Sequence, residues 1–343
     1  MSGKMRTRIF ISTSGRHLTR AAKEEDGTWA VDFLLEGQDI RCLAADPLDS
    51  SRVFAGRQEG GVLVSNNQGL TWQEAGLPEV SIKSLAVSKI EGNHLYAGTK
   101  SPPRIYHSKD SGMSWQELES FRKTRKWFWF SPAESTFAPY VQSIALSPTD
   151  PKVMMVGIEL GAVLRSADGG ESWSGHLKGS LRDCHTMAFH ETDGNWVYEA
   201  GGSGGGAAVS KDGGKSWQQE KKNLDRSYGW SCVGDGVDPQ TWYVSASSQA
   251  KFPNFVPQAH VDGKANASIY RRRGGEPWER LTGGLPDPLN NMAYSLKTDP
   301  QESGHLYAGL SSGDVWFTSD SGDSWQQVPV NLGGIHRDMV VIL

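Results

Sequence analysis

The chain has 343 residues, with 35 basic and 39 acidic side chains that leave a formal net charge of −4 at pH 7. Such a balance argues against a dedicated nucleic-acid binder, because these proteins usually carry a basic surplus. The 13 Trp, 9 Tyr and 11 Phe residues are spread along the chain and exclude a disordered protein.

An octapeptide that ends in tryptophan recurs along the chain. The clear copies run from Ser65 to Trp72, Ser108 to Trp115, Ser166 to Trp173, Ser210 to Trp217 and Thr318 to Trp325. Two degenerate copies end at Trp29 and Trp278. Successive marker tryptophans are 43 to 61 residues apart, which matches the length of a four-stranded blade in a β-propeller.

The segments around each marker have strand character. Residues 82–87, 94–98 and 104–108 are short runs rich in apolar and aromatic residues, bounded by Gly, Pro, Asp or Asn. The first such run, residues 8–12, matches the second strand of a blade, and residues 335–343 supply the missing inner strand. We therefore predict an all-β, seven-bladed β-propeller of four-stranded blades, one domain over residues 1–343, in which strand 335–343 pairs with the N-terminal strands and closes the ring.

The octapeptide residues favour a structural role. Asp or Asn at its third position can accept hydrogen bonds from turn amides, and Gly at its fifth position tolerates positive φ. The terminal tryptophan provides a large ring that can pack between neighbouring sheets. We therefore do not expect the repeated acids to be catalytic: Asp110, Asp168, Asp212 and Asp320.

The octapeptide is the Asp-box, so the chain resembles the Asp-box (BNR-repeat, sialidase-like) β-propellers over essentially its full length. This family includes glycosidases, sorting receptors and assembly factors, so the resemblance implies the fold more than an activity. Sialidases have six blades and an Arg-Ile-Pro motif, whereas this chain has seven markers and continues Arg104-Ile105 with Tyr106. It is therefore not expected to be a true sialidase, and its likeness is to single-domain glycosyl hydrolase-like repeat proteins.

Two long insertions are expected on the face where propellers usually bind ligands. Residues 120–139 form a basic and aromatic interblade loop that contains Trp127 and Trp129, and residues 247–267 join a second strand to a third. Long loops on one face of a rigid scaffold commonly carry function. Trp127 and Trp129 are candidate ligand-binding residues, with packing over a blade edge as the alternative.

Alignment of the inner strands brings one position near each strand start into register. This position is occupied by Arg41, Lys83, Gln142, His185, Trp230, Tyr294 and Arg337. We call these seven residues the rim, and their chemistry suits a small anionic or carbohydrate-like ligand, with cations to pair a carboxylate and rings to stack. A one-residue slip in register would replace the rim with small residues.

Three residues are candidate catalytic groups. Asp183 and Glu159 are acids expected on the ligand face, and His185 beside Asp183 can act as a general base. Structural salt bridges are the alternative role for the carboxylates. No His-x-His or His-x₃-His pair is present, so the sequence predicts no metal site and no cofactor. Cys42, Cys184 and Cys232 are expected to be free thiols.

The sequence leaves two functional classes open. One is a channel-mouth pocket for a small anionic or carbohydrate-like ligand, with or without hydrolase- or lyase-like activity. The other is a scaffold that binds a protein partner on the same face, with the aromatic residues Trp127, Phe128, Trp129 and Phe130 as anchors. No apolar run approaches the roughly 18 residues of a membrane span, and the charged N-terminus lacks a signal-peptide core. The expected location is therefore the cytoplasm, with no membrane or nucleic-acid partner.

Overall fold

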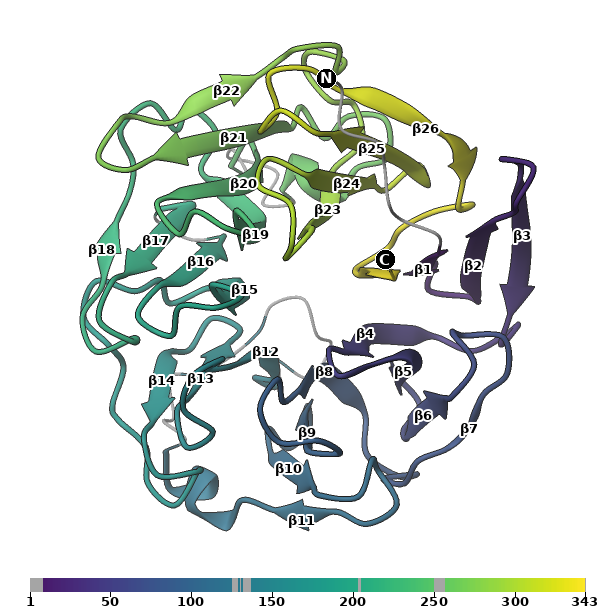
Figure 1. Cartoon of the computed structure of the whole chain (residues 1–343). Helices are drawn as coiled ribbons and strands as arrows, with labels where there is room; N and C mark the ends of the chain where they lie inside the picture. The colour runs from purple at the N-terminus through teal and green to yellow at the C-terminus, as the bar shows by residue number, and fades with distance from the viewer. Residues whose placement is uncertain are drawn as a thin grey trace.

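A computed structural model describes residues 9–124, 129, 131, 137–202, 205–249 and 257–342. The strands form seven antiparallel sheets arranged as blades around a central axis (Figure 1). Within the described ranges, six sheets have four strands and one has three. The predicted seven-bladed β-propeller is confirmed.

The first half of the chain and the C-terminal strand build four blades. One blade combines strands from both ends of the chain, and we call it the closing blade. From the inner to the outer position, it contains β27 (Met339–Ile342), β1 (Ile9–Thr13), β2 (Leu18–Lys23) and β3 (Trp29–Leu34). In the same direction, the next two contain β4 (Ile40–Asp46), β5 (Asp49–Arg57), β6 (Val62–Ser65) and β7 (Gln73–Glu74), and then β8 (Ile82–Val87), β9 (Leu95–Thr99), β10 (Ile105–Ser108) and β11 (Gln116–Glu117). The three-stranded sheet contains β12 (Val141–Leu146), β13 (Met154–Ile158) and β14 (Val163–Ser166).

The remaining three blades complete the ring. They contain β15 (Cys184–Phe189), β16 (Val197–Gly201), β17 (Ala207–Ser210) and β18 (Gln218–Gln219); β19 (Tyr228–Gly234), β20 (Thr241–Ser247), β21 (Ser268–Arg273) and β22 (Glu279–Leu281); and β23 (Ala293–Thr298), β24 (Leu306–Leu310), β25 (Asp314–Thr318) and β26 (Gln326–Asn331). Two short 3₁₀ helices are η1 (Glu119–Thr124) and η2 (Gln258–His260). Neither helix of the described chain has the length or apolar character needed to cross a membrane.

The C-terminal strand closes the ring. β27 is antiparallel to β1, with Ile9 opposite Ile342 and Ser12 opposite Met339, and Figure 1 shows the C-terminus beside β1. The inner position of this blade therefore comes from the far end of the chain, as the sequence predicted. Met339 is fully buried in this arrangement.

The blade formed by β12 to β14 departs from the expected four strands. An irregular segment takes the outer position: the Ser174 amide donates to the Arg165 carbonyl, and the Leu177 amide donates to the Val163 carbonyl. In β14, the Arg165 amide donates to the Ser174 hydroxyl at 2.9 Å, and the Val163 amide donates to the His176 imidazole at 3.3 Å. This blade therefore keeps its backbone hydrogen bonds without a regular fourth strand.

The carboxylate in an octapeptide turn accepts hydrogen bonds from other residues of the same turn. The Asp110 carboxylate accepts hydrogen bonds from the Ser108 hydroxyl and the Ser114 amide, each at 2.8 Å. Hydrogen bonding from Ser114 lowers the pKa of Asp110 to about 2. The Trp115 indole donates to the carbonyl of Ala75 in the preceding blade at 2.7 Å. The octapeptide thus rigidifies a turn and ties adjacent blades together.

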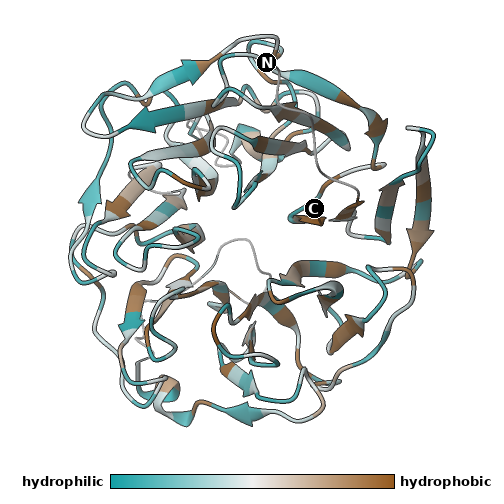
Figure 2. Ribbon diagram, viewed as in Figure 1, coloured by the Kyte–Doolittle hydropathy of each residue, from teal (hydrophilic) through white to brown (hydrophobic). Residues whose placement is uncertain are grey.

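The apolar core lies between blades, and several of the outermost strands are hydrophilic, whereas β3 is mostly apolar. Figure 2 shows this gradient, with β11, β18 and β22 polar at the outer edge. A Cβ added to Gly56 would lie 2.6 Å from the side chain of Ile82 in the next blade, and one added to Gly98 would lie 2.5 Å from Val141. Glycine at these strand ends therefore allows the next inner strand to approach closely.

Candidate functional site

Six of the seven rim residues lie at a break in the regular strand pairing. Pairing in the inner strands shifts between Ile40 and Cys42, Ile82 and Ser84, Val141 and Ser143, Cys184 and Thr186, Gly229 and Cys232, and Ala293 and Ser295. In the closing blade, Arg337 lies two residues before β27 begins. A β-bulge leaves a residue unpaired and redirects its side chain. The repeated irregularity explains why large polar groups can face the channel in these six blades.

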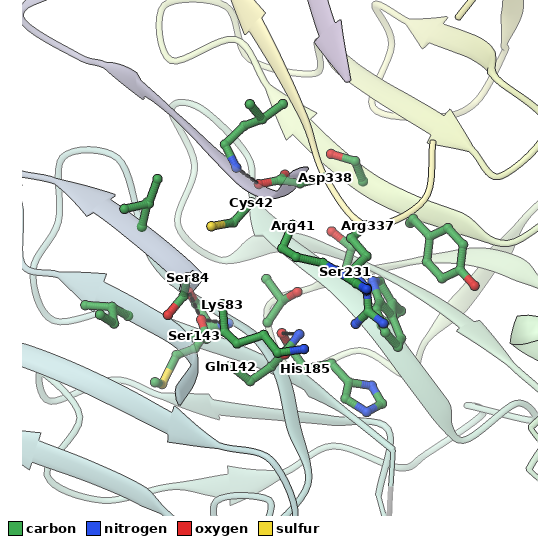
Figure 3. Close-up of a pocket in the computed structure, with 18 of the residues that line it drawn as sticks. Arg41, Cys42, Lys83, Ser84, Gln142, Ser143, His185, Ser231, Arg337 and Asp338 are labelled. Atoms are coloured by element: carbon green, nitrogen blue, oxygen red, sulfur yellow. Dashed lines mark hydrogen bonds between the residues drawn. The ribbon is translucent and has the colours of Figure 1, made fainter. Parts of the chain in front are cut away.

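The structure brings all seven rim residues together in the wall of one cavity of about 190 Å³ on the axis (Figure 3). Figure 3 shows Arg41, Lys83 and Arg337 extending into the same space. A wider cavity of about 530 Å³ opens at the mouth and shares Trp230, Tyr294 and Arg337 with the first. The register deduced from the sequence is therefore the register of the structure.

The small residues that follow the rim join adjacent inner strands. The Ser143 hydroxyl accepts a hydrogen bond from the Met187 amide at 3.0 Å, and the Ser231 hydroxyl accepts one from the Leu296 amide at 3.0 Å. In the closing blade, the Asp338 carboxylate takes this place and accepts from the Leu43 amide at 3.0 Å. These contacts join adjacent blades, and the rim residue Gln142 adds one more, since its amide donates to the His185 carbonyl at 3.3 Å.

The cations of the rim have different surroundings. Arg41 forms an ion pair with Asp39. The Lys83 ammonium lies 4.4 Å from the centre of the Tyr140 ring, a cation–π contact. Arg337 is half-buried, and its Nε atom has no hydrogen-bond partner among the described residues. Positive charge is therefore concentrated at the channel mouth, where a low-dielectric wall strengthens its field.

An aromatic wall adjoins these cations and includes two residues that the repeat pattern does not predict. Trp230 lies 5.0 Å from Tyr294, measured between ring centres. The missed residues are Tyr228 and His260: the His260 imidazole bridges the Tyr228 hydroxyl at 2.9 Å and the Tyr294 hydroxyl at 2.8 Å. Burial, together with the nearby His185, lowers the pKa of His260 to about 4. A neutral His260, which lies in η2, thus holds the hydroxyl groups of Tyr228 and Tyr294 in place through its two ring nitrogens.

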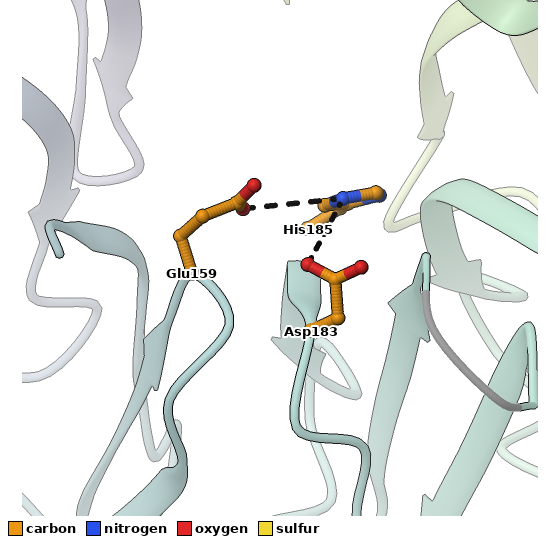
Figure 4. A group of neighbouring side chains, drawn as sticks. All are labelled: Glu159, Asp183 and His185. Carbon is orange, nitrogen blue, oxygen red and sulfur yellow. Dashed lines mark ion pairs between the residues drawn. The ribbon is translucent and has the colours of Figure 1, made fainter. Parts of the chain in front are cut away.

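The three candidate catalytic residues also lie together (Figure 4). His185 Nε2 is 3.6 Å from Asp183 Oδ1 and 3.9 Å from Glu159 Oε2. His185 follows Asp183 by two residues at the start of β15, and Glu159 directly follows β13 in the preceding blade. All three are at least 93% buried. Glu159 lines the wider cavity and His185 lines the axial one.

The environment of this group changes its proton affinities. Burial raises the pKa of Glu159 to about 7, although the nearby His185 opposes this shift. Burial alone would lower the pKa of His185, but the adjacent carboxylates of Asp183 and Glu159 raise it to about 9. A carboxyl group that exchanges a proton near neutral pH beside a cationic imidazole can serve as a general acid or base.

Of the two candidate tryptophans in the first insertion, the structure describes only Trp129. Trp127 lies outside the described residues. Trp129 is 5% exposed and packs in the core cluster that contains Phe121 and Ile158. It lines a separate cavity of about 480 Å³ beside β14. Trp129 is therefore neither an exposed anchor nor a wall of the channel mouth.

Comparison with known proteins finds no family model that matches this chain. The chain is 23% identical to the photosystem II assembly lipoprotein Ycf48 of Synechococcus sp. (strain CC9902) over 328 residues, which covers 94% of this chain and 85% of that protein. It is also 26% identical to the xyloglucanase Xgh74A of Acetivibrio thermocellus over 172 residues. That match covers 41% of this chain but only 20% of the xyloglucanase.

Solved structures of both kinds of protein are also similar to this chain in fold. An ancestral GH74 enzyme superposes with a TM-score of 0.62 at 19% identity, covering 84% of this chain and 38% of that one. The GH74 xyloglucanase of Xanthomonas campestris has a TM-score of 0.59 at 16% identity, covering 84% and 45%. Ycf48 bound to a D1 peptide has a TM-score of 0.54 at 14% identity, covering 84% and 82%. The chain is thus a seven-bladed β-propeller that resembles GH74 and Ycf48 structures.

Proposed function

We propose that this protein binds a small anionic, carbohydrate-like ligand such as a sugar acid at the mouth of its central channel. The observation that carries the proposal is the convergence of one rim residue from each blade on one cavity. Arg41, Lys83 and Arg337 supply positive charge there, and arginine can pair a carboxylate through two parallel hydrogen bonds. No packing requirement explains why large polar groups recur at the start of inner strands.

The aromatic wall supports the carbohydrate-like part of the proposal. Trp230 and Tyr294 are each 7% exposed and border both cavities. Aromatic faces bind flat, apolar surfaces of a ligand, while the tyrosine hydroxyl remains available for hydrogen bonds. The wider cavity, at about 530 Å³, has the volume usual for small-molecule sites, roughly 300–1,000 Å³.

An enzymatic form of this function uses Glu159, Asp183 and His185 in hydrolysis or elimination on the bound sugar. The proton exchange expected of Glu159 and His185 favours it, as does the partial similarity to a xyloglucanase. The test is product release from a panel of oligosaccharides and uronic-acid polymers, with Glu159→Gln as the variant that removes the acid. Turnover that persists in Glu159→Gln would contradict this assignment.

The second candidate function is a protein-binding scaffold that uses the same face. Similarity to an assembly lipoprotein over 94% of the chain favours it, together with the likeness to a Ycf48 structure that contains a bound peptide. An acidic peptide segment would suit the cations of the rim. A pull-down with wild type and Arg337→Ala tests this function, and the scaffold proposal requires a partner that the variant no longer captures.

The proposed ligand is tested by thermal unfolding with sugar acids, phosphosugars and neutral oligosaccharides. The variants are Arg337→Ala and His185→Ala, with Lys109→Ala on an exposed octapeptide turn as the control. A ligand present at about 100 times its Kd stabilises the folded state by roughly 2.7 kcal/mol. Stabilisation by anions alone, lost in both rim variants and kept in the control, is the expected result. Equal stabilisation of all four proteins would overturn the proposal.

A further inference from the structure

The separations within Glu159, Asp183 and His185 are too long for hydrogen bonds. Imidazole-to-carboxylate hydrogen bonds are about 2.7–2.9 Å long, whereas His185 Nε2 lies 3.6 Å from Asp183 Oδ1 and 3.9 Å from Glu159 Oε2. One oxygen or nitrogen atom from each residue lies within 4.8 Å of the other two. The three groups therefore surround a small space instead of closing on one another.

The orientation of His185 fixes which nitrogen faces that space. His185 Nδ1 lies 2.7 Å from the Gly229 carbonyl oxygen. Because a carbonyl oxygen can only accept a hydrogen bond, Nδ1 carries the proton in this contact. Nε2 is then directed at the carboxylates. Histidines that bind metals usually donate their other ring N–H to a backbone carbonyl or a carboxylate in this way.

Glu159 gives an independent indication of a ligand. The residue is 7% exposed, and among the described residues its carboxyl group has an ion pair with His185, at 3.9 Å, but no hydrogen bond. Buried polar groups in folded proteins nearly always have a partner. The Glu159 side chain is directed at His185 across the enclosed space (Figure 4), so a partner in that space would satisfy it.

Gly202 lies against Asp183 and His185 and leaves room for both side chains. A Cβ added there would lie 2.3 Å from Asp183 Oδ2 and 2.9 Å from His185 Cε1.

A metal ion would fit between the three residues after small movements of their side chains. Bonds of about 2.0–2.2 Å between ion and ligand atoms would separate neighbouring ligand atoms by roughly 3–3.5 Å. Movements of less than about 1 Å would therefore bring the three observed ligand atoms onto one ion.

We propose that Glu159, Asp183 and His185 bind a divalent first-row transition ion of the Mn²⁺ or Zn²⁺ class. One imidazole nitrogen and two carboxylate oxygens form the donor set, and the nitrogen favours these ions over Mg²⁺ and Ca²⁺. Arg337 and Lys83 also face Glu159 and oppose a cation, so two carboxylates are needed to outweigh them. Because Glu159 lines the wider cavity, the remaining coordination positions face the proposed ligand. The site goes beyond the proposed binding of an anion and does not depend on it.

The test is titration of the full, chelator-treated chain with Mn²⁺ and Zn²⁺ by calorimetry, without any organic ligand. The variants are Glu159→Gln, Asp183→Asn and His185→Gln. Glu91→Gln is the matched control, since Glu91 Oε2 also contacts an imidazole, His94 Nδ1, at 2.9 Å. The expected result is one ion per chain, bound at least tenfold more weakly by each of the three variants and unchanged in the control.

Two results would overturn the metal proposal. One is no saturable binding of either ion by folded wild type. The other is binding that the three variants leave unchanged, which would locate the ion elsewhere on the surface. Circular dichroism of each variant identifies any that fails to fold, and Glu159→Gln, which removes no volume, remains informative if His185→Gln does not fold. Repeating the anion thermal-shift assay with EDTA separates the two proposals, because rim binding of an anion persists when the metal site fails.

Discussion

Deleting residues 335–343 should prevent the whole ring from folding, not only its last blade. Four side chains in this segment are at least 95% buried: Ile335, Met339, Val340 and Ile342. Each contributes about 1.5–3 kcal/mol when buried, so together they contribute roughly 6–12 kcal/mol. A folded domain is stable by only about 5–15 kcal/mol. The deletion therefore removes most or all of the free energy of unfolding.

Urea unfolding followed by tryptophan fluorescence and near-ultraviolet circular dichroism measures this effect. Met339→Ala should lower the free energy of unfolding by about 2–5 kcal/mol, while Val341→Ala, at a half-buried position, should lower it by less than about 1.5 kcal/mol. The truncated chain should show no cooperative transition. A truncated chain that unfolds cooperatively at the wild-type midpoint would refute the claim that this strand holds the ring closed.

Individual contacts support four further predictions. Gly202→Ala should weaken anion binding and lower the melting temperature, because its Cβ would lie 2.3 Å from a carboxylate oxygen of the site; Gly92→Ala, with nothing within 4 Å, should change neither. A hydrogen bond from the Ser172 hydroxyl lowers the pKa of Asp168 to about 2, so the stabilisation that ionised Asp168 gives is complete above about pH 4 and is lost toward pH 2. Melting curves of Asp168→Asn should lack this acid dependence. Burial raises the pKa of Glu199 to about 8, so ionisation makes the wild type less stable as pH rises from about 4.5 to 8, and Glu199→Gln should reduce that decline in denaturant titrations. Trp129→Ala should lower stability but leave the anion-induced shift in melting temperature intact; loss of that shift would contradict its separate location.

The architecture was predictable because its signal repeats. Each clear octapeptide places Asp or Asn, a glycine and a tryptophan in the same turn, and with the two degenerate copies the seven tryptophan markers predict the number of blades. The rim was predictable for the same reason, since glycines such as Gly56 and Gly98 end second strands at a constant distance from the inner strand. What the spacing could not reveal is the irregular pairing at Arg41 and its equivalents, because that break belongs to strand pairing and not to residue type.

The parts of the site that could not be predicted come from segments outside the repeat. His260 lies in an insertion without a counterpart in other blades, so no register relates it to Tyr228 or Tyr294. The location of Trp129 was also hidden, because a basic and aromatic run has the same composition whether its rings bind a ligand or fill a core. The outer position beside β14 is a third case, where Ser174 and His176 replace strand hydrogen bonds with side-chain contacts.

The alternation between rim residues and the small residues that follow them has a consequence for evolution. Holding the blades together is assigned to positions such as Ser143 and Ser231, while the adjacent Gln142 and Trp230 face the channel. A substitution at a channel-facing position alters one-seventh of the mouth and leaves its neighbour's interblade hydrogen bond in place. Seven such positions can therefore change one at a time, so a lineage can explore new ligands through folded intermediates.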